Sequence, residues 1–188
     1  MSVLTHKPKV EPVRKWTTMF QKMVPMLMDS WKEWQFFTDV GQIALAIPPS
    51  VDTSMPYKDQ LLHGTGSFHL KNWPYTDKDY TKLLAGFEYI QPILDYAKQQ
   101  GYIACRPMIR CLQPKTCLSY HADTAEMRFH IPLETSWQAF FVVQDTVHRM
   151  TEVGTLYSLQ TNVMHTAVNA NLLAPRLHFT LSVFKDSK

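Results

Sequence analysis

The hydrophobic period of the chain changes near Gly101, and this change constrains the fold more than any other feature of the sequence. Beyond that glycine, apolar and polar residues alternate in short runs, as in half-buried β-strands. Closely spaced runs of this kind predict an antiparallel sandwich or barrel. With helices packed outside, the strands would form a double-stranded β-helix, the jelly-roll or cupin-like architecture, although the period alone also fits an ordinary sandwich. The predicted strands are Tyr102–Leu112, Arg128–Leu133, Gln138–Val143, Thr155–Leu159, His165–Val168 and Leu177–Phe184.

The first part of the chain, residues 1–101, has a mixed and mainly helical pattern. Apolar residues recur at helical spacing from residue 16 to residue 34, and Pro25 is expected to break or kink that segment. The apolar run 41–47, which two prolines follow, predicts a strand. At 188 residues the chain fits one domain, so we expect residues 1–101 to pack on a β-rich core of residues 102–188.

A second helix is predicted from Tyr80 to Ala97, where apolar residues trace one helical face. Thr76 or Asp77 could cap its start, and Gly101 stands where a glycine commonly follows a helix. Pro92 lies inside the pattern and is expected to kink the helix. The predicted fold class is therefore mainly β with flanking helices.

Charge and cysteine content exclude several classes of protein. A formal net charge of +3 without a run of basic residues makes a nucleic-acid partner unlikely. Cys105, Cys111 and Cys117 lack metal-site spacing and predict buried thiols in a reducing compartment. The sequence contains no signal-peptide pattern and no apolar run of membrane-spanning length, so a cytoplasmic protein without a membrane partner is expected.

One constellation of residues carries chemistry: His121 and Asp123, then His165, then Arg176. Residues two apart on an extended segment point to the same side, so His121 and Asp123 can bind one ion while a third ligand comes from a distant strand. Two imidazoles and one carboxylate form the facial triad that binds Fe(II) and leaves coordination positions open. Arg176 could hold the far carboxylate of a dicarboxylate that chelates the metal. Taken singly, each residue could be an ordinary hydrogen-bonded or ion-paired side chain.

Several stretches around these residues resemble the aspartyl/asparaginyl β-hydroxylase family, which includes bacterial cis-proline hydroxylases. The resemblance covers about residues 103–184, and RFHIPLET is its most specific part. It is carried by LSYHAD (118–123), RFHIPLET (128–135), GTLY (154–157), His165, Asn169 and RLH (176–178). The resemblance implies a double-stranded β-helix and a hydroxylase that uses Fe(II), 2-oxoglutarate as cosubstrate, and O2.

The resemblance also implies roles for particular residues. His121, Asp123 and His165 would be the iron ligands, and Arg176 would bind the distal carboxylate of 2-oxoglutarate. Arg128 and His130 would reach the 1-carboxylate end beside the metal, although His130 could also be a packed strand histidine. Animal aspartyl hydroxylases of the family lack the acidic ligand, so Asp123 makes this chain more similar to the branch with a complete triad.

Arg110 departs from the family pattern, because aspartyl hydroxylases have a serine there that helps to hold the cosubstrate. Arg110 could instead bind an anionic group of the substrate or pair with a surface carboxylate. Trp73, Tyr75 and Trp137 are further candidates for a substrate pocket, and core or rim packing is the alternative for each. The expected substrate is a free amino acid such as proline or a residue within a polypeptide. Two other hypotheses are a non-catalytic cupin-like small-molecule-binding module and a zinc enzyme on the same fold.

Overall fold

Antiparallel β-sheets dominate a computed structural model of the protein, which describes residues 11–37, 41–56, 59–60 and 74–186. A six-stranded sheet has the order β1-β10-β7-β12-β5-β2, a four-stranded sheet has the order β6-β11-β8-β9, and β3 pairs with β4. The strands are β1 (Val13–Thr17), β2 (Gln42–Ala44), β3 (Ala46–Ile47), β4 (Lys82–Leu83), β5 (Tyr102–Leu112), β6 (Thr116–Cys117), β7 (Met127–Glu134), β8 (Ala139–Val143), β9 (Thr146–His148), β10 (Leu156–Gln160), β11 (His165–Asn169) and β12 (Arg176–Lys185).

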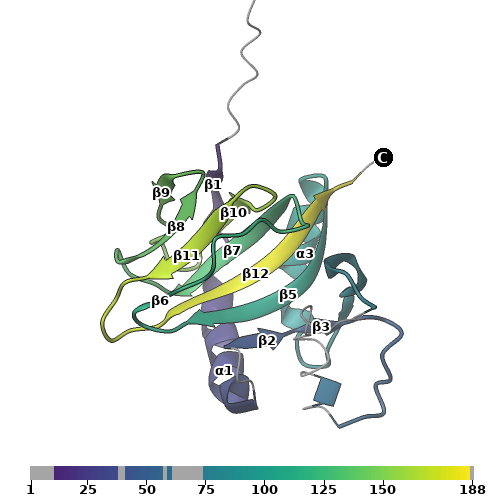
Figure 1. The fold of residues 1–188 in the computed structure, drawn as a ribbon. Helices are drawn as coiled ribbons and strands as arrows, with labels where there is room; N and C mark the ends of the chain where they lie inside the picture. The colour runs from purple at the N-terminus through teal and green to yellow at the C-terminus, as the bar shows by residue number, and fades with distance from the viewer. Residues whose placement is uncertain (1–10, 38–40, 57–58, 61–73, 187–188) are drawn as a thin grey trace, which may run out of the picture.

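Two hydrophobic clusters lie on opposite faces of the large sheet. Helices α1 (Val24–Trp34) and α3 (Gln91–Gln99) cover one face (Figure 1), where Leu27 and Ile93 pack in the same cluster as Phe129 and Phe179. On the other face, residues of both sheets meet in a smaller cluster: Leu112, Phe141, Val143, Met150, Tyr157, Leu159 and Ala167. Since alternate residues of a strand face opposite sides, every second residue of β7 and β12 points between the sheets. This interior face carries the polar candidate residues.

The prediction of a mainly β protein with flanking helices is confirmed. All six predicted strands are present, as β5, β7, β8, β10, β11 and β12, with ends that differ by at most one residue. Strong alternation made them predictable, because each strand has one apolar face that must be buried.

The helix predictions for the first part of the chain are wrong at their beginnings. Residues 13–17 form β1, and Pro25 stands in the first turn of α1 instead of breaking a longer helix. The run 41–47 is divided into β2 and β3, which join different sheets. Proline fits the first turn of a helix because its missing N–H has no partner there.

The predicted helix from Tyr80 to Ala97 is likewise shorter. It begins at Gln91, after the 3-10 turn η4 (Glu88–Ile90), and Pro92 stands in its first turn instead of in its interior. Thr76 caps a different element, the 3-10 turn η3 (Asp77–Asp79), through a capping box with Asp79. Gly101 does follow the helix, with φ of 80°.

The cysteine prediction holds only in part. Cys105 is buried, and burial raises the pKa of its thiol to about 12. Cys111 is partly buried, whereas Cys117 is exposed, so its predicted burial is wrong. All three are free thiols. None of the helices in the described ranges combines the length and apolar character needed to cross a membrane.

Gly154 fixes the approach of the N-terminal segment to the sheet. Its φ is 75°, and a Cβ placed there would stand 2.6 Å from Cα of Gln21. We expect Gly154→Ala to lower the free energy of unfolding by about 2–4 kcal/mol, because backbone strain adds to a clash that cannot relax cheaply. Gly101→Ala is the matched control, since Gly101 also has positive φ but nothing within 4 Å of an added Cβ. Equal losses in urea denaturation would show that the close approach to Gln21 is irrelevant.

Candidate active site

The structure brings His121, Asp123 and His165 together between the two sheets. His121 and His165 form an isolated antiparallel bridge, with backbone N–O distances of 3.0 and 2.8 Å, and the amide of Asp123 donates to Thr161 O at 2.7 Å. Asp123 Oδ1 lies 3.5 Å from His121 Nε2, and Asp123 Oδ2 lies 3.9 Å from His165 Nε2. The possible ligand atoms of the three residues all lie within 4.8 Å of one another.

Backbone carbonyls select the tautomer of both histidines. Nδ1 of His121 lies 2.6 Å from Ser119 O, and Nδ1 of His165 lies 2.8 Å from Val163 O. Because a carbonyl can only accept a hydrogen bond, a neutral ring in this position carries its proton on Nδ1. Each Nε2 then presents a lone pair toward Asp123, and burial further lowers the pKa of His165. An N–H that donates to a backbone carbonyl is the usual arrangement behind a metal-binding imidazole.

The residues present fit a divalent cation. Oδ2 of Asp123 is buried and accepts no aligned hydrogen bond among the described residues. Such an atom costs free energy unless a ligand satisfies it. Two neutral imidazoles and one carboxylate are the donor set of non-haem Fe(II) sites. Cysteines contribute no thiolate to the group, so its composition does not favour a structural zinc site.

A network of charges connects the triad to the N-terminal part of the chain. Arg128 Nη2 lies 3.0 Å from Asp123 Oδ2 and 3.6 Å from Asp77 Oδ2. Asp77 also contacts Arg106 Nη1 at 2.7 Å and accepts a hydrogen bond from the Ser182 hydroxyl. Burial alone would raise the pKa of Asp77, but the guanidinium groups of Arg106 and Arg128 hold it below its usual value.

Arg176 is a buried cation without a carboxylate partner among the described residues. Its guanidinium lies 4.3 Å above the ring of Phe141, and Nη2 is 3.2 Å from Nδ1 of His178. Burial lowers the pKa of Arg176 to about 9. A buried charge is costly unless it is paired, and a guanidinium binds carboxylates with two parallel hydrogen bonds. The position therefore fits an anionic ligand, such as the distal carboxylate of 2-oxoglutarate.

His130 and His178 lie between Arg176 and the triad on the same interior face. Their Nδ1 atoms are 3.4 Å apart, and the Nε2 atom of each is buried without a hydrogen-bond partner in the described chain. The ring of His130 also packs against Phe141. Burial, followed by the charge of Arg176, lowers the pKa of both histidines well below the usual value. Unsatisfied Nε2 atoms beside a cation fit a polar ligand better than simple packing does.

These two histidines predict a loss of stability in acid. Each stays neutral in the folded protein but takes up a proton in the unfolded chain below pH 6.5, so stability is fully present above that pH and falls as pH decreases. Between pH 7.5 and 5.5 each group should remove about 1.4 kcal/mol from the free energy of unfolding. We expect His178→Gln to reduce this pH-dependent loss by about the same amount in urea denaturation. An unchanged loss would mean that His178 is protonated in the folded protein.

The remaining candidates have different surroundings. Arg110 makes one polar side-chain contact, to Met108 Sδ at 3.4 Å, and its Nε is buried without a partner among the described residues. Burial, followed by the charge of Arg128, lowers the pKa of Arg110 well below the usual value. Among the described residues, no carboxylate forms an ion pair with Arg110, so the two alternatives for this residue stay predictions.

Two of the three aromatic candidates lie among the described residues. Trp137 is 70% exposed, and Arg149 stacks on its ring. The hydroxyl of Tyr75 accepts a hydrogen bond from Ser50, and its ring packs against Tyr80. Trp73 lies outside the described residues. Neither a role for His178 nor a partner for Arg128 was predicted from the sequence. For His178, the only signal was its two-residue spacing from Arg176.

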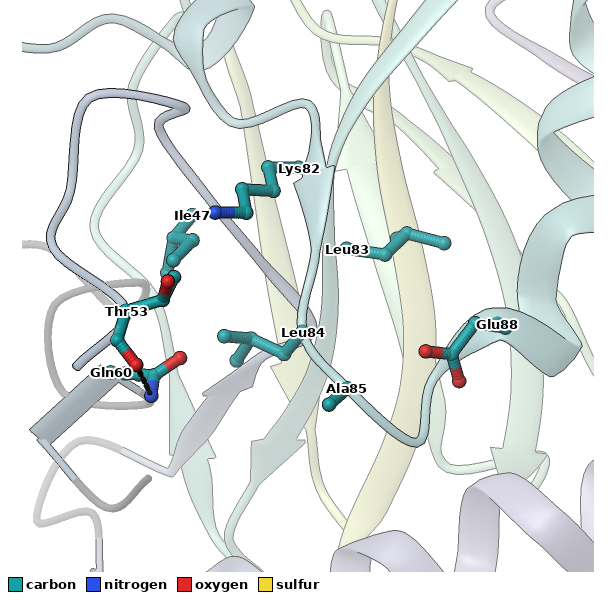
Figure 2. A pocket seen from close by; sticks show the side chains of 8 residues that line it. All are labelled: Ile47, Thr53, Gln60, Lys82, Leu83, Leu84, Ala85 and Glu88. Atoms are coloured by element: carbon teal, nitrogen blue, oxygen red, sulfur yellow. Dashed lines mark hydrogen bonds between the residues drawn. The ribbon is translucent and has the colours of Figure 1, made fainter. Parts of the chain in front are cut away.

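A pocket of about 310 Å³ lies away from the triad, around β3, β4 and the residues that follow β4 (Figure 2). Its lining contains no histidine, and its charged side chains are Lys82 and Glu88. The full lining consists of Ile47, Thr53, Gln60, Lys82, Leu83, Leu84, Ala85 and Glu88. These residues offer no group of metal ligands and no buried charge for an anion, so the interior face between the sheets remains the candidate active site.

Comparison with known proteins assigns the chain to a family. The sequence profile of the Aspartyl/Asparaginyl beta-hydroxylase family matches residues 69–186, which include the triad, Asp77 and Arg176. The chain belongs to this family. No curated protein sequence is significantly similar to this member of the aspartyl/asparaginyl β-hydroxylases.

Solved structures share the fold of this family member. A structure described as IDO from Bacillus thuringiensis has a TM-score of 0.51 at 9% identity, covering 94% of this chain and 92% of that one. The viral collagen prolyl hydroxylase vCPH from Paramecium Bursaria Chlorella virus-1 has a TM-score of 0.50 at 9% identity, with coverage of 93% and 96%. These similarities confirm the predicted double-stranded β-helix.

Proposed function

We propose that this protein is an Fe(II)- and 2-oxoglutarate-dependent oxygenase that hydroxylates a C–H bond of an amino acid or of a protein side chain. One observation carries the proposal. A metal-ligand triad, in which one carboxylate oxygen accepts no aligned hydrogen bond in the described chain, shares an interior face with Arg176, a buried cation that lacks a carboxylate partner there. A divalent cation would satisfy the first, and a dicarboxylate cosubstrate would satisfy the second. Membership of the family supports the same activity.

The protein's own residues would bind and orient the reactants. His121 and His165 would present Nε2 to the metal, because their Nδ1 atoms are engaged by carbonyls. Arg176 would hold the distal carboxylate, while Arg128 and His130 would contact the other end beside the metal. Bound Fe(II), with 2-oxoglutarate and O2, would supply the oxidising chemistry. The apolar residues between the sheets would exclude water from it.

Arg110 supports a substrate that carries a carboxylate. Its guanidinium is held beside that of Arg128, and neither an ion pair nor a surface carboxylate in the described chain neutralises it. A substrate anion would remove part of this cost. Free amino acids carry such a group, and an aspartyl side chain of a polypeptide carries one as well.

Succinate formation tests the proposed activity. Anaerobically purified protein would be supplied with Fe(II), 2-oxoglutarate and ascorbate, and then with O2 and a panel of free amino acids, their amides and short peptides. We expect succinate that rises with one substrate and is lost in His165→Ala and Arg176→Ala. A preference for the free acid over its amide, lost in Arg110→Gln, would support the carboxylate-bearing substrate. Absence of both succinate and 2-oxoglutarate binding would reject the proposal and favour the non-catalytic cupin-like module.

A further inference from the structure

Asp77 belongs to the N-terminal part of the chain, yet it reaches the charges around the triad. It lies on η3, is only 5% exposed, and contacts two guanidinium groups and the Ser182 hydroxyl. Its Oδ1 engages Arg106 at 2.7 Å, while its Oδ2 lies 3.6 Å from Arg128 Nη2. The backbone amide of Arg106 donates to Tyr80 O at 2.8 Å, just after η3, so both side chain and backbone fix this turn against β5.

Arg128 is thereby held between two carboxylates. The same Nη2 that faces Asp77 lies 3.0 Å from Asp123 Oδ2. This second contact is close, but Oδ2 of Asp123 accepts no aligned hydrogen bond in the described chain. An arginine and a carboxylate that can relax freely form aligned and often bidentate hydrogen bonds. The Arg128 Nη2 atom is instead shared between Asp123 and Asp77.

We propose that Asp77 is a positioning residue that keeps the Arg128 guanidinium from forming aligned, bidentate hydrogen bonds with Asp123 and so keeps the Asp123 carboxylate available for the metal. This inference rests on the proposed metal site. Without Asp77, the Arg128 guanidinium would turn fully onto Asp123 and compete with the metal for both carboxylate oxygens. Arg128 would then also be drawn away from the place where a cosubstrate carboxylate would bind.

The affinity for Co(II) alone measures this effect without any turnover. Co(II) is the probe because it accepts nitrogen and oxygen donors and its visible absorption reports coordination. We expect Asp77→Asn to weaken Co(II) binding by about 10- to 100-fold, the range found when a partner behind a metal ligand is removed. The spectrum of the bound ion should also change, because Asp123 would be a weaker ligand. A thermal unfolding curve would show that the variant is folded.

Two further variants separate positioning from simple charge. Asp77→Asn/Arg106→Gln removes one negative and one positive charge, so the network keeps its net charge while Arg128 still loses its second carboxylate. We expect this double variant to show weakened Co(II) binding too, and it carries the test if the single variant does not fold. In an Arg128→Gln background, Asp77→Asn should change the affinity less than about two-fold, because no guanidinium is left to turn onto Asp123.

Each outcome is decisive. Wild-type affinity in the charge-balanced double variant, or an equal loss with and without Arg128, would overturn the positioning role while leaving the metal site intact. Failure of the wild-type protein to bind Co(II) in a manner sensitive to His165→Ala would overturn the metal site itself, and the role of Asp77 with it.

Discussion

Arg176→Met is expected to weaken 2-oxoglutarate binding strongly and, at the same time, to make the ligand-free protein more stable. The wild-type guanidinium is buried against Phe141 and His178, and burial lowers its pKa to about 9. Replacing a buried charge by an apolar side chain of similar length should raise the free energy of unfolding by about 1–3 kcal/mol. Loss of the cation should weaken 2-oxoglutarate binding by on the order of 100-fold or more.

Both effects can be measured on one set of samples. Urea denaturation without ligand gives the stability, and titration with 2-oxoglutarate in the presence of Mn(II) gives the affinity. Arg149→Met is the matched control, because Arg149 lies over the exposed Trp137 and not between the sheets. It should change neither the affinity nor the unliganded stability by more than about 0.5 kcal/mol. A less stable Arg176→Met protein that binds 2-oxoglutarate normally would mean that Arg176 has only a structural role.

His165→Ala is expected to remove metal binding almost completely. The imidazole of His165 is buried, oriented by Val163 O and directed at Asp123, so alanine removes one of the three donors of the proposed metal site. For the wild-type protein, a metal concentration of 1,000 times the dissociation constant should add about 4 kcal/mol to the free energy of unfolding. The variant should lose most of this gain, and its succinate formation should fall to background. Chelation of the wild-type protein should reproduce both losses.

His148→Ala provides the control for a histidine outside the triad. His148 lies on β9, the outer strand of the small sheet. Its variant should keep the metal-dependent gain in stability and the succinate formation of the wild type. Metal-dependent stabilisation that survives in His165→Ala but disappears in His148→Ala would move the metal site elsewhere and contradict the assignment.

The elements that follow from a pattern of neighbouring residues could be predicted from the sequence, whereas the elements that depend on pairing with distant segments could not. The strands β7 and β12 could be predicted from alternation alone, because one face of each carries apolar core residues and the other carries polar residues, although both faces are buried. The starts of α1 and α3 were wrong because Pro25 and Pro92 were treated as breaks within longer helices. Whether a proline begins or interrupts a helix depends on where the preceding segment pairs, and β1 and β4 pair with partners far along the chain.

The candidate site divides in the same way. The sequence by itself determined that His121 and Asp123 share one side of an extended segment and that His165 and Arg176 stand at a suitable distance along the chain. Only the tertiary structure decided that backbone carbonyls fix the histidine tautomers. It also decided that Arg128 lies between Asp123 and Asp77. The physical reason is that such contacts join segments that fold together only when the sheets close, so no local pattern in the sequence encodes them.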